Sequence, residues 1–349
     1  MADKKISIII PCYNVEKYID RCFESLRNQT IGIDSMELIF INDASADGTL
    51  SKLTEYEQQY PKSVLVINFT ENQRQGTARN VALTYASAPY IGYVDSDDWV
   101  EWNMFEKMVD AIERYDCDFV ECGFDYAKDH RHRQPTKQWG STGFMDLTDA
   151  SVRQLFVKSK VALVMVWDKV FKKSFIEEND IFFPEKTLHE DIFFVYLAFN
   201  YARSYYYMDD VLYHYFVNEG GTMQAKKADH QFMKMPVTLF FLQTCMERGL
   251  FDVRQKDIEW MFLERYYVYM LWEVFEQFPD RAYETYIEMK DTIYQCIPEY
   301  SSNPYRKLSG NEFDDMMIKL LDLDLNCEEL KKMRDYMLKT IRTKESNDF

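Results

Sequence analysis

The chain lacks the features that mark two broad classes of protein. Its seven cysteines are odd in number and form no Cys-x-x-Cys pair, so they do not resemble the disulfide framework of a small secreted domain. No apolar run approaches the ~20 residues that a membrane-spanning helix needs, and no segment typical of a signal peptide precedes the first apolar run, at residues 6–10. We therefore expect a protein of the reducing cytoplasm without a transmembrane segment.

Positive charge is also scarce. The chain has 41 Lys and Arg residues against 58 Asp and Glu, which gives a net charge of −17 at pH 7. Because it shows no basic stripe interleaved with aromatic residues, we do not expect nucleic acid as a partner. Apolar residues are abundant instead: 47% of the 349 residues are hydrophobic and 16% are aromatic. That composition is enough for a folded core with an accessory domain.

We expect the protein to be organised around residues 90–99. An apolar run of strand length is followed there by three carboxylates within four residues, Asp95, Asp97 and Asp98. Because buried unpaired carboxylates are costly, the acids should lie past the carboxyl end of the strand, where open α/β sheets bind their ligands. Oxygen ligands at that place suit Mg²⁺ or Mn²⁺. The alternative is that Asp98 caps the next helix, which accounts for only one of the three acids.

Apolar runs alternate with amphipathic segments through the first part of the chain. This pattern predicts an α/β fold with a mainly parallel sheet flanked by helices. The expected strands are residues 6–10, 37–42, 64–69, 90–94, 119–124 and 205–215. Polar residues follow the first four of these runs, and we expect them together at one edge of the sheet.

The character of the chain changes near residue 223. Residues 228–349 show long helical periodicities and few strand signals. We predict an α/β domain of residues 1–227 followed by a separate helical domain of residues 228–349.

Motifs in the order of a known family run through the α/β part of the chain. They are Pro11-Cys12-Tyr13-Asn14, Gln29-Thr30, the run from Asn42 to Thr49, Gly76-Thr77-Ala78-Arg79-Asn80, Asp95-Ser96-Asp97-Asp98, the run from Trp167 to Phe171, Glu190-Asp191 and the run from Tyr213 to Glu219. In these motifs the chain resembles the family 2 glycosyltransferases, inverting enzymes with the GT-A nucleotide-sugar fold. It departs from the family at Phe216 and Gly221, where Arg and Ser are common.

The resemblance implies that residues 1–100 bind a nucleotide sugar and that residues 101–227 bind the acceptor. It places Pro11 and Tyr13 beside the nucleobase and makes Asp43 the acceptor of a hydrogen bond from uracil. An aromatic ring and a carboxylate suit these tasks. Taken alone, Tyr13 is nearly as well explained as a core aromatic, and Asp43 as the cap of a turn.

The same resemblance assigns the acids and the arginine. Asp95 would meet the ribose of the donor, Asp97 would ligate the metal, and Asp98 would act through a second-shell bond. Arg79 opens a helix at the same edge and could hold a phosphate bidentately. A salt bridge from Arg79 to one of these aspartates is an equally good expectation.

The resemblance also implies how the sugar is transferred. Asp191 is the candidate general base for the acceptor hydroxyl, and Glu190 orients a hydroxyl or the loop of the base. A general base contributes ~10²–10⁴-fold, and a divalent metal stabilises the leaving diphosphate. A single displacement by one base inverts the anomeric carbon. Read alone, Glu190 and Asp191 would merely cap the helix that follows.

We therefore expect an inverting, metal-dependent glycosyltransferase that moves a hexosyl or N-acetylhexosaminyl group from a UDP-sugar to a hydroxyl. Its acceptor would be a glycan or a lipid- or protein-linked glycan of surface polysaccharide or glycoconjugate synthesis. The alternatives are a non-catalytic nucleotide-sugar-binding scaffold and a sugar nucleotidyltransferase. The latter would need a Gly- and Lys-rich phosphate loop, whereas residues 11–25 contain only Lys17.

The large apolar side chains of residues 228–349 exceed what one amphipathic helix needs. They either form a bundle core that shapes the acceptor cleft or present an apolar face to a second chain or a membrane surface. We expect a homodimer joined through these helices. Peripheral contact with the inner face of the membrane is the weaker expectation, because it would need Lys and Arg.

Overall fold

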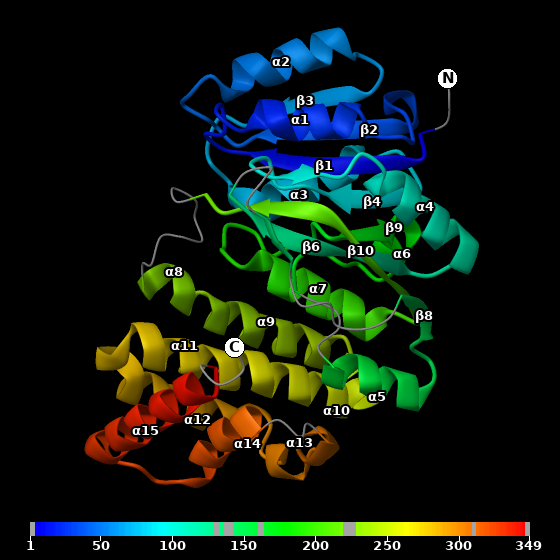
Figure 1. Ribbon diagram of the computed structural model, residues 1–349. Helices are drawn as coiled ribbons and strands as arrows, with labels where there is room; N and C mark the ends of the chain where they lie inside the picture. The colour runs from blue at the N-terminus through cyan, green and yellow to red at the C-terminus, as the bar shows by residue number, and fades with distance from the viewer. Residues whose placement is uncertain are drawn as a thin grey trace. The chain divides into compact units, whose positions relative to one another are not determined.

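The computed structural model describes residues 4–128, 133–135, 142–159, 164–218, 228–308 and 312–345. The chain divides into two compact units, Met1–Met233 and Lys234–Phe349 (Figure 1). The sequence analysis placed the boundary a few residues earlier, after residue 227.

Four parallel strands form the first half of the sheet. They are β1 (Ile6–Cys12), β2 (Met36–Asn42), β3 (Val64–Asn68) and β4 (Tyr90–Tyr93), in the spatial order β3-β2-β1-β4. The chain builds outward from β1 to β3 and then returns to the other side of β1. The carboxyl ends of β1 and β4 are therefore a topological switch point, the place where sheets of this kind bind ligands.

Helices cover both faces of this half-sheet. On one face, Ile6, Ile8 and Ile10 of β1 share a buried cluster with side chains from α1 (Ile19–Arg27), α2 (Thr49–Gln59) and α4 (Met104–Tyr115). Because successive side chains of a strand point to opposite faces, the residues between these three point to the other face of the sheet.

The opposite face carries α3 (Arg74–Tyr85) and α7 (Glu190–Tyr201). There the Tyr93 ring of β4 packs edge-on against Phe183 and against Phe194 of α7. Helix α3 lies against β1, β2 and α7.

The second half of the sheet is mixed. It contains β9 (Lys169–Lys172), β6 (Phe119–Ala127), β10 (Ser204–Phe216) and β5 (Trp99–Val100), with β7 (Arg133–Pro135) and β8 (Gly143–Asp146) on its edges. Among the described strands, four pairings are parallel and five antiparallel. The predicted α/β fold is confirmed, with a larger antiparallel share than the strand–helix alternation indicated. The added pairings come from the short strands β5, β7, β8 and β9.

The remaining helices of the first unit are α5 (Ala150–Ser159), α6 (Lys173–Glu178) and α8 (Ala228–Phe232). The His189 ring nitrogen Nε2 lies 3.1 Å from the carbonyl oxygen of His230. This contact joins α8 to the residue that precedes α7.

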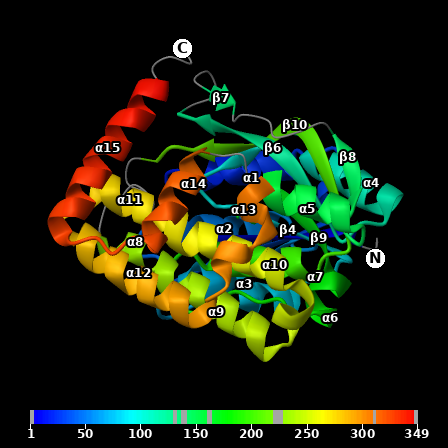
Figure 2. The same ribbon diagram turned by 90° about the horizontal axis from the view of Figure 1, so that it is seen from below.

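The second unit is helical. Its elements are α9 (Lys234–Glu247), α10 (Leu250–Phe262), the π-helix η3 (Leu263–Tyr269), α11 (Met270–Gln277), α12 (Ala282–Cys296), α13 (Pro304–Leu308), α14 (Glu312–Lys319) and α15 (Cys327–Glu345), with short 3₁₀ turns between several of them. Helix α15 lies against α12 (Figure 2). Several aromatic side chains of the second unit are buried, among them Trp260, Phe262, Tyr266 and Tyr267. None of the helices that the structure describes is long and apolar enough to cross a bilayer.

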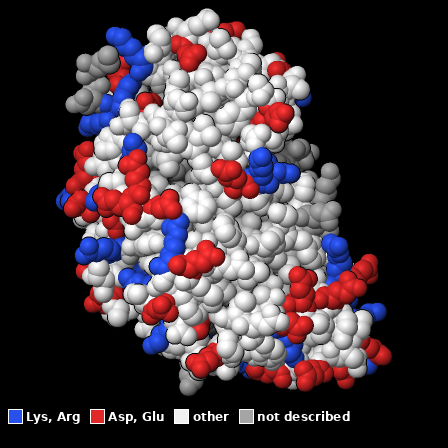
Figure 3. All heavy atoms as spheres, turned by 180° about the vertical axis from the view of Figure 1, so that it is seen from behind, with Lys and Arg blue, Asp and Glu red and all other residues white. Residues whose placement is uncertain are grey.

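Charged side chains of both signs occur on the surface of the described residues. On the face shown in Figure 3, the described Lys and Arg residues are interspersed with Asp and Glu.

A fully buried lysine lies in the second half of the sheet. The Lys169 ammonium donates to Asp168 Oδ1 at 2.7 Å and to the Met165 carbonyl at 2.9 Å, and it lies 3.2 Å from Glu121 Oε2. Tyr205 donates to the same Glu121 oxygen. Burial raises the pKa of Asp168 to about 6, although the Lys169 charge opposes this shift.

We predict that Lys169→Met lowers the free energy of unfolding by about 3–5 kcal/mol, because it leaves two buried carboxylates without their cation. Lys172→Met is the matched control on the same strand: Lys172 pairs with the exposed Asp116 and should cost at most about 1 kcal/mol. Urea unfolding measures both. Equal losses for the two variants would contradict the stabilising role of Lys169.

Candidate active site

The loops that follow β1 and β2 are tied to each other. The Asn14 amide donates to Ser45 Oγ at 3.0 Å, and Asn14 Oδ1 accepts from the Ala46 amide at 2.8 Å. Next to this junction Tyr13 is 52% exposed, so it is not a core aromatic and a ligand could reach it. Pro11 is buried at the end of β1, and its carbonyl accepts from Ser96 Oγ at 2.8 Å.

Asp43 joins the end of β2 to helix α3. Its carboxylate accepts from the amides of Gln73 at 2.6 Å and Arg74 at 2.9 Å, where α3 begins. Its own amide donates to the carbonyl of Cys12, between Pro11 and Tyr13. Asp43 thus caps the start of α3, rather than its own turn as the alternative to ligand contact supposed. A carboxylate has about four lone-pair sites, so these two bonds leave capacity for another donor.

The three acids after β4 have different surroundings. Asp98 is buried and accepts from the Tyr213 hydroxyl at 2.6 Å and the Phe216 amide at 2.7 Å. Asp97 accepts from Asn218 Nδ2 at 3.3 Å. Burial and then the charge of Asp95 raise the pKa of Asp97. Asp98 is therefore an internal anchor of the loop, whereas Asp95 and Asp97 are partly exposed at the sheet edge.

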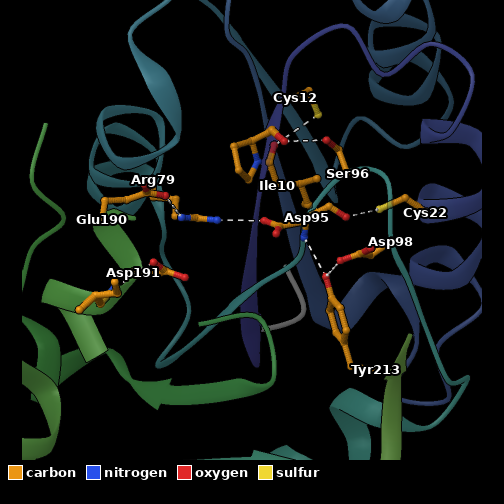
Figure 4. Close-up of polar contacts among 12 residues, drawn as sticks. Ile10, Cys12, Cys22, Arg79, Asp95, Ser96, Asp98, Glu190, Asp191 and Tyr213 are labelled. Carbon is orange, nitrogen blue, oxygen red and sulfur yellow. Dashed lines mark hydrogen bonds and ion pairs between the residues drawn. The ribbon is translucent and has the colours of Figure 1, made fainter. Parts of the chain in front are cut away.

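Arg79 lies between the acidic loop and helix α7. Its guanidinium donates through Nη2 to Asp95 Oδ1 at 2.9 Å and through Nη1 to Glu190 Oε1 at 2.6 Å (Figure 4). Its side chain is 3% exposed. Burial opposes the charged form, but Asp95 and Glu190 outweigh it and raise the pKa of Arg79. Of the two expectations for Arg79, the structure contains the salt bridge to an aspartate; a phosphate contact stays a prediction.

Glu190 and Asp191 are in the first turn of α7. Glu190 is buried, and burial raises its pKa to about 7, although the Arg79 charge opposes the shift. Asp191 is partly exposed, and its Oδ1 accepts from the Ile192 amide at 2.9 Å. The pair therefore differs: Glu190 faces Arg79 inside the protein, while Asp191 is accessible from the edge where the acidic loop lies (Figure 4).

The Gly76 to Asn80 motif fits α3 to the segment that leads into α7. A Cβ atom on Gly76 would lie 2.5 Å from the Pro184 carbonyl oxygen and 3.1 Å from Glu190 Cγ, so only glycine allows this approach. Asn80 donates to the Phe183 carbonyl at 2.8 Å and accepts from the Phe183 amide at 2.9 Å. Gly76, Arg79 and Asn80 thus hold the segment that carries Glu190 and Asp191.

Sequence reasoning did not single out Tyr213 as a site residue. Its hydroxyl donates to Asp98 and accepts from the Asp95 amide at 3.1 Å, and its ring stacks on Trp167 with centroids 4.2 Å apart. Both aromatic residues belong to the family-like motifs. In the sequence, the feature that could have revealed them is that each aromatic residue stands within a motif beside polar residues. Glu219, the end of the last motif, and Gly221, one of the two departures from the family, lie outside the described residues.

The donor set at this edge fits a divalent cation. No group of three or more His, Cys, Asp and Glu converges into a metal cage in the described part of the chain. Mg²⁺ and Mn²⁺ sites that also bind phosphate need only one or two carboxylates. Asp95 and Asp97 lie close enough for the charge of one to raise the pKa of the other, and a cation between them would relieve that repulsion.

Comparison with known proteins points to the same family as the motifs. The model of the family "Glycosyl transferase family 2" matches residues 7–177. The chain belongs to the family 2 glycosyltransferases. It is 31% identical over 227 residues to the putative glycosyltransferase EpsH of Bacillus subtilis, a match that covers 64% of each chain. The chain thus spans less than two thirds of the length of that relative.

Two further matches extend into the helical part. The chain is 27% identical over 322 residues to the cholesterol galactosyltransferase of Borreliella burgdorferi, which covers 86% of this chain and 87% of that protein. The crystal structure of Staphylococcus aureus TarS 1–349 in complex with UDP-GlcNAc superposes with a TM-score of 0.73 at 19% identity, covering 96% of this chain and 92% of that chain. This family 2 glycosyltransferase therefore has the predicted GT-A fold, followed by a helical region.

We predict that Gly76→Ala lowers the midpoint of thermal unfolding by several degrees, because the new methyl group meets a backbone carbonyl that cannot rotate away. Overpacking of this kind costs about 1–3 kcal/mol, and in a unit of this size 1 kcal/mol corresponds to about 2–4 °C. The control is Gln75→Ala, at the exposed neighbouring position. If the two variants unfold at the same temperature, α3 does not need Gly76 for this contact.

Proposed function

We propose that this protein is an inverting, metal-dependent glycosyltransferase that uses a UDP-sugar as donor. The observation that carries the proposal is the pair of contacts from Arg79, which brings Asp95 of the acidic loop and Glu190 beside Asp191 to one edge of the sheet. That edge is the switch point between β1 and β4. A site for a nucleotide sugar and a general base for an acceptor are thus adjacent.

The loops after β1 and β2 suit the nucleotide. The exposed Tyr13 ring offers a stacking face for a base, and the free lone pairs of Asp43 suit the imide N–H of uracil. Pro11, which is buried at the end of β1, is proposed to lie beside the nucleobase. TarS, the structural neighbour, was crystallised with UDP-GlcNAc. These points support UDP over other nucleotides, with Asp95 directed toward the ribose and a hexose or N-acetylhexosamine as the transferred group.

We assign the divalent cation, Mn²⁺ or Mg²⁺, to Asp97 with Asp95 beside it. A bound cation would stabilise the charge that develops on the leaving diphosphate. Asp98 acts through its neighbours, because its bonds to Tyr213 and Phe216 fix the loop that presents Asp97.

Asp191 is the proposed general base. It is accessible at the site edge, and it would take the proton of the acceptor hydroxyl as the oxygen attacks the anomeric carbon. Glu190 and Arg79 keep the turn that carries Asp191 in place. One displacement inverts the anomeric centre, so an α-linked donor gives a β-linked product.

The acceptor is proposed to be a hydroxyl of a glycan or glycoconjugate of surface polysaccharide synthesis. Relatives with curated names that include minor teichoic acid biosynthesis and poly(ribitol-phosphate) β-glucosyl transfer support that class. The predicted homodimer through the helices of residues 228–349, and peripheral membrane contact, remain proposals. Several large apolar side chains of the second unit, such as Val253 and Tyr336, are exposed and could take part.

The experiment that tests the function is a donor screen with UDP release as the readout. Asp191→Asn should bind UDP-sugar as the wild type does, because it keeps the shape of the side chain, but should lower the transfer rate by about 10²–10⁴-fold. Glu185→Gln, an exposed acid six residues away, is the control and should retain the wild-type rate. Parallel losses of donor affinity and rate would mark Asp191 as structural, and release of pyrophosphate from UTP would identify a nucleotidyltransferase instead.

A second prediction concerns the metal. EDTA should abolish UDP release, Mn²⁺ or Mg²⁺ should restore it, and Asp97→Asn should weaken Mn²⁺ binding at least tenfold without changing the unfolding midpoint by more than a few degrees. Asp110→Asn on the exposed side of α4 is the control. Full activity in EDTA would contradict the metal assignment.

A further inference from the structure

Helix α1 runs along the loop that carries the acids. Arg21 and Ser25 of the helix and Gln29, two residues past its end, are spaced four residues apart and form one stripe. They bond to the backbone between Asp97 and Phe105. Arg21 Nη2 donates to the Asp97 carbonyl at 2.6 Å, Ser25 Oγ accepts from the Val100 amide at 3.2 Å, and Gln29 bonds to the Glu101 carbonyl and the Phe105 amide. The side chains of this stripe therefore hold the backbone that begins at Asp97, the proposed metal ligand.

Arg21 is the member of this stripe nearest to the site. Its guanidinium carbon lies 3.9 Å from the centroid of the Trp99 ring and 4.3 Å from that of Phe216. The two rings come from different strands, β5 and the end of β10, and are tilted by 52° to each other. They form the two walls of a clamp, with the guanidinium in the corner between them. An arginine held in this way has lost its rotamer freedom before it makes its hydrogen bond.

Asp97 is also held from its other end. Asn218 donates to Asp97 Oδ2 at 3.3 Å, Tyr18 donates to Asn218 Oδ1 at 3.4 Å, and the Tyr18 ring packs on Phe216 with centroids 5.4 Å apart. The carbonyl of Asp97 is therefore held by Arg21 of α1, and its carboxylate by Asn218, which follows β10. Phe216, where the family commonly has arginine, forms one wall of the clamp.

Resting on the proposed function, we infer that Arg21 is a positioning residue for the metal site: by holding the Asp97 carbonyl, it fixes the direction in which the Asp97 carboxylate meets the cation. The charge of Arg21 by itself would disfavour a divalent cation nearby, because like charges repel. What helps is the planar, clamped hydrogen-bond donor. Partners one shell away from a metal typically contribute 10–100-fold to its affinity.

The geometric and the electrostatic roles predict opposite results. Arg21→Lys keeps the charge but loses the planar clamp, and Arg21→Met loses both. If Arg21 positions Asp97, both variants should weaken Mn²⁺ binding by about tenfold or more. If only its charge acts, Arg21→Met should bind Mn²⁺ more tightly than the wild type, and Arg21→Lys should be unchanged.

The test is a titration of the full chain with Mn²⁺, in the presence of saturating UDP, followed by electron paramagnetic resonance of free Mn²⁺. Arg27→Met is the control on the same helix, because Arg27 pairs with exposed Glu24 away from the loop. Unchanged Mn²⁺ affinity in both Arg21 variants, or tighter binding in Arg21→Met, would overturn the inference. A purely structural role would lower the unfolding midpoint and leave the affinity of the folded protein unchanged.

If the Arg21 variants do not fold, the variant Phe216→Leu provides the test instead. It removes one wall of the clamp but leaves Arg21 and the backbone bond to Asp98, and it should weaken Mn²⁺ binding in the same direction. An unchanged affinity in Phe216→Leu would then refute the clamp. A wild type that releases no UDP in the presence of Mn²⁺ would instead refute the proposed function, whatever the variants bind.

Discussion

The site depends on one buried cation between two carboxylates. Arg79 comes from α3, Asp95 from the loop after β4, and Glu190 from the start of α7, and the guanidinium is almost inaccessible to water. A buried cation is tolerated only beside opposite charges. The two carboxylates that Arg79 meets come from segments far apart in the chain, so the two ion pairs hold these segments together. Asp95 on the proposed donor side and Asp191 on the acceptor side acquire their spacing from this constraint.

Two helices act as rigid supports for the loops that carry the chemistry. The Gly76 to Asn80 face of α3 holds the segment before α7. Arg21 and Ser25 of α1, with Gln29 just past its end, hold the segment after β4. In both cases side chains of one helix region bond to the backbone of a distant segment and fix its position. Sites built in this way are pre-organised, which lowers the cost of aligning donor and acceptor.

Several of these features were accessible from the sequence. The apolar run before Asp95 and the polar residues after the other strands predicted a ligand edge, and the ordered motifs indicated the fold. The role of Arg79 was not accessible, because phosphate contact and a salt bridge need the same residue type. The partners of Lys169, Asp98 and Gln29 were also hidden, since pairing across 48 to 115 positions depends on topology. The antiparallel strands β5 and β9 were too short to give a periodic signal.

The most direct test of this account is a double-mutant cycle between Asp95→Asn and Glu190→Gln, measured by urea unfolding with Arg79 present and again with Arg79→Gln. If Arg79 links the two acids, the effects of the single changes should fail to add by about 0.5–3 kcal/mol with Arg79 present. They should add to within about 0.5 kcal/mol once Arg79 is replaced. Additivity in the wild-type background, or an unchanged interaction energy without Arg79, would contradict the account.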